Sequence, residues 1–134
     1  MTRIIKQTVR FKSPPRVIYG LLMDSKKHSA FTGDKAVISR EIKGKISAYD
    51  GWIEGENIRL KENAEIVQKW RGADWPAGVW SVATFKLKTT KDGGTELTFT
   101  HIGVPEEFAE DIEEGWKEYY WKKIKRYLGE KQVL

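Results

Sequence analysis

The sequence contains no cysteine and only two histidines, His28 and His101. The lack of cysteine excludes disulfides, thiol catalysis and zinc sites built on thiolates. Two histidines are too few for a three-histidine metal centre. The G-x-S-x-G motif of serine hydrolases and the phosphate-binding loop motif are also absent. We therefore expect a non-enzymatic protein with no catalytic residue, no metal site and no cofactor.

Long apolar runs are missing as well. No stretch is long enough to span a membrane, and the N-terminus does not read as a signal peptide. Hydrophobic residues make up 40% of the chain and charged residues 32%, which is typical of a globular protein. The 134 residues predict one domain, residues 1–134. We expect a cytoplasmic protein that is a monomer or a weak dimer.

The net charge of +5 would permit an anionic partner. However, the lysines are spread along the whole sequence, and six acidic residues gather between positions 106 and 114. Those carboxylates would repel phosphate groups. We therefore interpret the excess of lysine as a solvated surface and expect no specific binding of nucleic acid.

The last part of the chain, residues 105–129, predicts one long amphipathic helix. Pro105 suits the first turn of a helix, and Gly129 suits a left-handed stop. Acidic residues fill the first half and basic residues the second, which complements the helix dipole. A step of about 100° per residue places a broad apolar face on one side. That face consists of Phe108, Ile112, Trp116, Tyr119, Tyr120, Ile124 and Tyr127.

The N-terminal part predicts one strand and two short helices. Residues 3–11 alternate between apolar and polar side chains, as a half-buried strand does. Ser13 is a good N-cap for a helix over residues 14–24. A second helical turn over residues 25–31 is expected to end near Gly33.

The middle of the chain predicts about six consecutive strands. Asp50-Gly51 is a strong tight-turn pair, and residues 55–57 indicate a bend. A meander of this kind is antiparallel and has one apolar face. The last helix is long and apolar enough to cover that face. The predicted fold is therefore α+β: a curved antiparallel sheet of six to seven strands, two short helices, and a long C-terminal helix across the concave face. The expected strands are residues 36–40, 44–50, 52–54 continued after the bend by 58–61, 65–71, 79–89 and 95–102.

Several local motifs occur in one order along the chain. They are Phe31-Thr32, Trp70-Arg71, Trp75-Pro76 with Gly78, Gly94-Thr95-Glu96-Leu97, Gly103-Val104-Pro105, and Gly115-Trp116 with Tyr119-Tyr120 and Ile124. Together they resemble the family of Hsp90 ATPase activators, specifically its C-terminal domain. That family is part of the helix-grip superfamily, which includes the START domains and the major birch pollen allergen. The resemblance implies a helix-grip fold and a chaperone partner of the Hsp90 type.

The sequence also departs from the eukaryotic members of that family. Those proteins carry another domain, which makes the main contact with the chaperone, and nothing in this sequence corresponds to it. His101, within His-Ile-Gly-Val-Pro, is more similar to stand-alone microbial members. We therefore expect a stand-alone domain.

The leading functional hypothesis is the binding of an apolar or aromatic small molecule between the sheet and the last helix. Both the resemblance and the aromatic face of the helix motivate it, because small-molecule sites are apolar with a few placed polar groups. The expected lining residues are Phe99, His101, Trp116, Tyr119 and Tyr120.

His101 has two interpretations. Alternation along residues 95–102 places it on the inner face with Leu97 and Phe99. It is either a cavity histidine that binds a ligand, or a core histidine that is satisfied by neighbouring polar groups. We favour the second interpretation.

Gly115 and Lys123 are not explained by simple packing of the helix. A glycine within a helix costs about 1 kcal/mol relative to alanine, so Gly115 indicates a close approach or a need for room. Lys123 lies within the apolar stripe. It either faces a cavity and pairs with an anionic ligand group, or extends outward from the helix end.

The second hypothesis is a protein-interaction module that acts on an Hsp90-type chaperone. The residues expected to contact the partner are Trp70, Arg71 and Trp75, since tryptophan and arginine are common interface anchors. In the alternative interpretation, Trp70 packs inside, Trp75 fixes a hairpin loop, and Arg71 pairs with Asp74.

Overall fold

The structure, a computed structural model, describes residues 1–130, so residues 131–134 of the predicted domain lie outside the described part. Its elements are β1 (Thr2–Phe11), α1 (Pro15–Met23), α2 (Ser25–Thr32), β2 (Val37–Ile38), β3 (Lys45–Ala48), β4 (Ile53–Lys61), β5 (Glu65–Gly72), β6 (Ser81–Thr89), β7 (Thr95–Pro105), α3 (Glu106–Trp116), the π-helical segment η1 (Lys117–Trp121) and α4 (Lys122–Tyr127).

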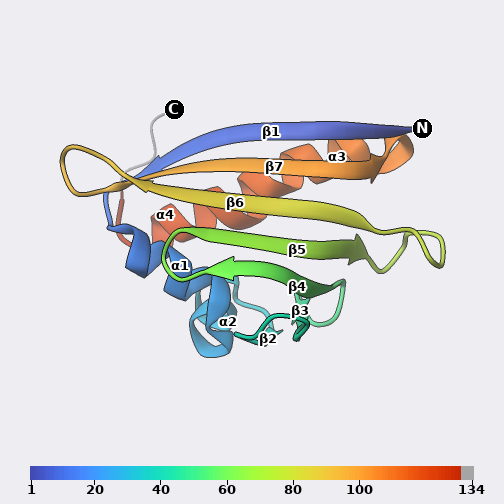
Figure 1. The fold of residues 1–134 in the computed structure, drawn as a ribbon, viewed down its shortest axis with the longest axis horizontal. Helices are drawn as coiled ribbons and strands as arrows, with labels where there is room; N and C mark the ends of the chain where they lie inside the picture. Colours follow the sequence, from blue (N-terminus) through green and yellow to red (C-terminus); the bar gives the residue numbers. More distant parts are fainter. Residues whose placement is uncertain (131–134) are drawn as a thin grey trace.

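The strands form one seven-stranded antiparallel sheet in the order β1-β7-β6-β5-β4-β3-β2. The first strand therefore returns to pair with the last, while β2 to β7 follow one another as a meander. Figure 1 shows the long C-terminal helix crossing one face of this sheet, with α1 and α2 at one end. The predicted α+β helix-grip fold is confirmed.

Alternation along the strands decides which side chains face the helix. On β7, Leu97, Phe99 and His101 are completely buried, whereas the residues between them are partly or fully exposed. On β6, Ala83 and Phe85 are buried in the same way. The apolar core therefore lies between this face of the sheet and the helix that covers it.

β4 runs through the bend expected at residues 55–57 as one continuous strand. Its pairing with β5 shifts register between Asn57 and Arg59, which is the mark of a β-bulge. Gly55 is required for a close approach: a Cβ atom there would lie 2.1 Å from the carbonyl oxygen of Lys69. The glycine thus indicates tight contact between strands and not a turn.

The predicted helix ends are confirmed in part. Gly33 and Gly129 have φ angles of +81° and +74°, as left-handed helix stops do. Ser13, however, does not cap α1, because the N-cap position is occupied by Pro14 and no side chain caps the helix. The carbonyl oxygen of Ser13 accepts a hydrogen bond from Thr95 Oγ1 at 2.8 Å. In the described part of the chain, no helix combines the length and apolarity needed to cross a membrane.

The C-terminal helix is interrupted by the π-helical segment η1. A π turn contains more residues than an α turn, so the side chains beyond it are set back around the helix axis. Trp121 therefore turns inward and is buried, while Tyr127 turns outward and is half exposed. The prediction that Tyr127 belongs to the inner apolar face is therefore wrong, and the predicted face did not include Trp121.

Gln7 on β1 holds this irregular turn against the sheet. Its amide Nε2 donates to the carbonyl oxygen of Glu113 at 2.8 Å. Its Oε1 accepts a hydrogen bond from Trp121 Nε1 at 2.7 Å. One side chain thus satisfies a backbone carbonyl just before the π segment and the indole that the segment turns inward.

Candidate functional site

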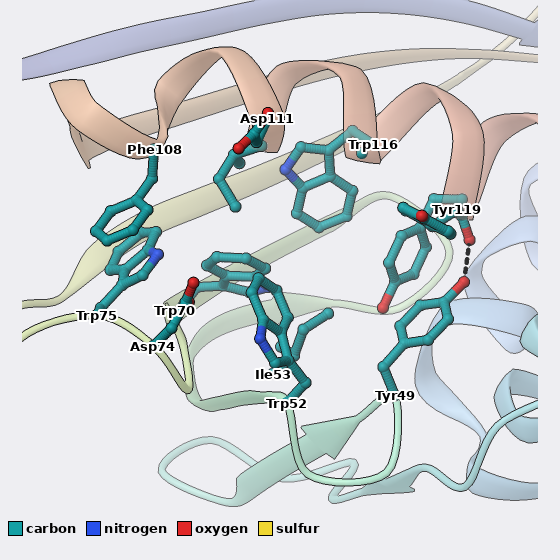
Figure 2. Close-up of a pocket in the computed structure, with 13 residues that line it drawn as sticks. Tyr49, Trp52, Ile53, Trp70, Asp74, Trp75, Phe108, Asp111, Trp116 and Tyr119 are labelled. Atoms are coloured by element: carbon teal, nitrogen blue, oxygen red, sulfur yellow. Dashed lines mark hydrogen bonds between the residues drawn. The ribbon is translucent and has the colours of Figure 1, made fainter.

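An open cavity of about 450 Å³ lies between the long helix and the sheet (Figure 2). We call it the aromatic cavity. Its lining residues are Tyr49, Trp52, Ile53, Trp70, Asp74, Trp75, Phe108, Asp111, Ile112, Gly115, Trp116, Tyr119 and Tyr120. They come from the turn before β4 and the first residue of β4, from β5 and the loop after it, and from α3 and η1.

The back wall is formed by Trp70 from β5 and Trp116 from α3, whose ring centroids are 5.7 Å apart. Both rings are buried by the alternation of β5 and by the inner face of the helix. His101 packs behind them, with its ring centroid 4.9 Å from that of Trp70. The structure thus places His101 and Phe99 in the core next to the wall, and neither belongs to the cavity lining.

Hydrogen bonds fix the protonation of His101. An indole N–H can only donate, so Trp116 Nε1 donates to His101 Nδ1 at 3.1 Å. The proton of the neutral imidazole then sits on Nε2, which donates to Ser81 Oγ at 2.7 Å. The Ser81 hydroxyl donates in turn to the carbonyl oxygen of Trp70, also at 2.7 Å. Burial lowers the pKa of His101 to about 3, so the ring stays neutral at physiological pH.

A second buried histidine fixes Tyr120 in the same manner. His28 Nδ1 donates to the carbonyl oxygen of Leu22 at 3.2 Å, which leaves Nε2 to accept from the Tyr120 hydroxyl at 2.9 Å. Burial lowers the pKa of His28 to about 4. The Tyr120 hydroxyl is therefore engaged on the side of α2, and the tyrosine offers only its ring to the cavity.

Tyr49 ties the turn before β4 to the helix. Its hydroxyl donates to the carbonyl oxygen of Tyr119 at 2.5 Å, and the two rings meet edge to face at 5.8 Å. Burial raises the pKa of the Tyr49 hydroxyl. Tyr119 and Trp52 are 55% and 39% exposed, so they form the mouth of the cavity at this end.

The opposite end is closed by Trp75 and Phe108, whose rings stack with centroids 6.0 Å apart. Trp75 reaches this place by packing over Gly72: a Cβ atom on that glycine would lie 3.1 Å from Trp75 Nε1 and 2.8 Å from Trp52. In the described residues, Trp75 Nε1 has no hydrogen-bond partner. A glycine at position 72 is therefore needed for the two tryptophans to pack against this strand.

Arg71 organises the loop that carries Trp75. Its guanidinium donates to the carbonyl oxygens of Trp75 at 2.6 Å and Pro76 at 3.1 Å. It pairs with Glu54 at 3.0 Å, so the alternative that it pairs with Asp74 is wrong. Only 13% of the Arg71 side chain is exposed.

The predicted ligand-binding and partner-contact residues lie in different places in the structure. Trp116, Tyr119 and Tyr120 line the cavity. Trp70 and Trp75, which we expected to contact a partner, are buried in its walls. A role of these residues in binding a ligand or a partner stays a prediction.

Lys123 lies outside the lining residues. Its ammonium donates to the carbonyl oxygen of Thr32 at 2.9 Å, at the C-terminus of α2. It also lies over the rings of Tyr49 and Tyr119, at 5.4 and 5.7 Å from their centroids. The ammonium thus has partners within the protein, including a carbonyl at the negative end of a helix.

The site residues predicted from the sequence leave out several lining residues, among them Tyr49, Trp52, Ile53, Phe108, Asp74 and Asp111. A signal existed for the first two, since they are aromatic residues on either side of the Asp50-Gly51 turn. Within residues 1–130, no three histidine or acidic side chains gather in a way that could hold a metal ion.

Comparisons with known proteins agree with this architecture. The chain matches the family described as "Activator of Hsp90 ATPase homolog 1-like protein" over residues 12–129. It is 32% identical over 125 residues to the human "Activator of 90 kDa heat shock protein ATPase homolog 1", covering 93% of this chain and 36% of that protein. A homologue from Dictyostelium discoideum is 32% identical over 124 residues, covering 92% of this chain and 32% of that protein.

The chain spans about a third of the length of these curated relatives. A crystal structure of an HSP90 activator from Plasmodium falciparum superposes with a TM-score of 0.88 at 25% identity, covering 94% of this chain and 96% of that one. The match to the family extends from the end of β1 to the end of the C-terminal helix. This chain therefore belongs to the family of Activator of Hsp90 ATPase homolog 1-like proteins.

Proposed function

We propose that the chain is a non-enzymatic binding domain that holds an apolar or aromatic small molecule in the aromatic cavity. The observation that carries the proposal is the open cavity of about 450 Å³ whose walls are mostly aromatic rings. Pockets of roughly 300–1,000 Å³ with apolar walls are typical of small-molecule sites.

Two polar groups at the back wall are engaged within the protein, which favours an apolar ligand body there. The Trp116 indole donates to His101, and the Tyr120 hydroxyl bonds to His28. Both groups are thereby directed away from the cavity, which leaves ring faces to meet a ligand. These bonds also hold the rings in place before binding, and such preorganisation reduces the ordering cost of association.

Titration with a neutral aromatic alcohol, 2-naphthalenemethanol, tests the proposal by calorimetry. We expect saturable binding at one site. A Gly115→Leu variant should abolish it, because Gly115 lines the cavity and the nearest atom to an added Cβ is Tyr119 Cδ2 at 3.7 Å. Glu114→Leu, on the exposed side of the same helix, is the matched control and should bind normally.

Native mass spectrometry of protein from its own cells adds an independent readout. We expect a co-purifying small molecule in the wild-type protein and its loss in the Gly115→Leu variant. Equal binding of the alcohol by folded wild-type and Gly115→Leu protein would contradict the proposal.

A second candidate function is that of a co-chaperone of an Hsp90-type chaperone. The family match and the printed names of the human and Dictyostelium relatives favour it. The test adds the purified protein to Hsp90 and measures both binding and the ATPase rate. We expect binding with a raised rate; neither binding nor a rate change would remove this candidate.

A further inference from the structure

We infer that the ligand of the aromatic cavity is an organic cation, in which an apolar or aromatic body carries an ammonium or similar group that binds between Asp74 and Asp111. This inference rests on the proposed function of the cavity. It adds the charge of the ligand and the direction in which the ligand lies.

The charge of the lining residues is the first observation. Among residues 1–130, the charged side chains that line the cavity are those of Asp74, in the loop after β5, and Asp111, on α3. Neither takes part in an ion pair within the described part of the chain. The chain as a whole has a net charge of +5, so the acidic charge of the cavity lining is not a consequence of its composition.

The surroundings of Asp111 strengthen the negative potential. Two of its four neighbours one helical turn away, Glu107 and Glu114, are acidic as well. All three side chains belong to exposed residues. A cation beside these exposed carboxylates would remain partly hydrated, so binding would not require the full removal of its water.

The aromatic walls supply the second part of the recognition. The face of an aromatic ring attracts a cation within about 6 Å of its centroid, and tryptophan does so most strongly. Trp52, Trp70 and Trp75 line the same cavity as Asp74. A cation held by the carboxylates would therefore have tryptophan rings beside it.

Lys123 sets the direction of the ligand. It already places a positive charge over the rings of Tyr49 and Tyr119, at 5.4 and 5.7 Å. Figure 2 shows these tyrosines across the cavity from Asp74 and Phe108. The fixed ammonium repels a second cation from the tyrosine end. The cationic group of a ligand is thus directed to the carboxylates, and its apolar body to the tyrosines.

Three probes that share one naphthalene ring test the inference: (2-naphthylmethyl)trimethylammonium, 2-naphthalenemethanol and 2-naphthoate. We expect the cation to bind the wild-type protein about tenfold more tightly than the alcohol, and the carboxylate to bind least. Added sodium chloride should reduce the preference for the cation and leave the affinity for the alcohol unchanged, because salt screens exposed charges.

A double variant, Asp74→Asn with Asp111→Asn, should bind the cation and the alcohol with nearly equal affinity, while its affinity for the alcohol stays at the wild-type value. The matched control is Glu41→Gln with Glu62→Gln, which removes two exposed carboxylates that do not line the cavity. The control should keep the preference.

The outcomes separate the two proposals. If the alcohol binds and the cation binds no more tightly, or if the Asp74/Asp111 double variant keeps the preference, the charge inference is overturned and the proposed function stands. If none of the three probes binds, both are overturned.

Discussion

Trp116 Nε1 donates a hydrogen bond to His101 Nδ1 over 3.1 Å, joining the long helix to the sheet at the back of the aromatic cavity. Because the indole cannot accept, this one contact selects the neutral tautomer of His101 and leaves Nε2 to donate to Ser81. The wall of the cavity thus depends on an uncharged histidine.

Lowering the pH should therefore reduce the free energy of unfolding at pH values where most carboxylates are still ionised. Burial lowers the pKa of His101 to about 3 and of His28 to about 4 in the folded protein. In the unfolded chain both titrate near their usual value of about 6.5, so below that pH the unfolded state binds more protons. The stabilisation from each neutral histidine is complete above about pH 6.5. It is lost as the pH falls towards the pKa of that histidine in the folded protein. Between pH 7 and pH 5 we expect the free energy of unfolding to decrease by about 2 kcal/mol per histidine.

Urea denaturation at pH 7, 6 and 5 measures this decrease. His28→Gln and His101→Gln should each halve the decrease, whatever they do to the stability at pH 7. A wild-type protein whose free energy of unfolding is the same at pH 7 and pH 5 would refute the assignment of two neutral buried histidines.

Gln7→Leu should destabilise the protein by about 2 kcal/mol. The change leaves Trp121 Nε1 and the carbonyl oxygen of Glu113 without the partners that Gln7 provides. Thr8→Val, on the adjacent exposed position of β1, is the control and should change stability by less than about 0.5 kcal/mol. Chemical denaturation gives both values; equal stabilities of the two variants would show that Gln7 does not support the π turn.

Gly115→Ala should stabilise the protein by about 0.5–1 kcal/mol. Alanine is the better helix former, and its Cβ would meet only Tyr119 Cδ2 at an ordinary 3.7 Å. Gly103→Ala is the contrasting variant and should destabilise, because Gly103 has a φ angle of +78°. The melting temperatures of the two variants should move in opposite directions; a lower melting temperature for Gly115→Ala would contradict the open space beside Gly115.

Tyr49→Phe should cost about 1 kcal/mol of stability, since it removes the hydrogen bond to the Tyr119 carbonyl. It should also weaken binding of 2-naphthalenemethanol, because the turn before β4 is no longer tied to the helix. Tyr127→Phe, at an exposed position of α4, should change neither property. Calorimetry measures the affinity of both variants for the alcohol. An unchanged affinity in Tyr49→Phe would count against a role of the Tyr49–Tyr119 hydrogen bond in binding.

Much of the fold could be predicted from local patterns. Period-two alternation identified the buried face of β7, and Gly33 and Gly129 marked two helix ends. Such signals are carried by neighbouring residues, so one sequence contains them in full. The close contact at Gly55 could not be predicted, because the same residue type serves turns and close contacts between strands.

The cavity could be predicted only in part. Trp116 and Tyr120 lie on the helix face that a regular step defines, so their inward direction was accessible. The π turn was not, because one changed hydrogen-bond step leaves no distinct mark in the sequence; it moved Trp121 inward. Asp74 and Asp111 come together only when the loop after β5 meets α3, which is a tertiary contact.

The indole N–H region of the NMR spectrum tests the central claim most directly, because the six tryptophans divide between the cavity and the rest of the molecule. On addition of 2-naphthalenemethanol, the signals of Trp52, Trp70, Trp75 and Trp116 should shift and saturate together, since these residues line the cavity. Trp80 and Trp121, which do not line it, should keep their positions. Shifts confined to Trp80 or Trp121, or no shifts at all with excess probe, would contradict a binding site in the aromatic cavity.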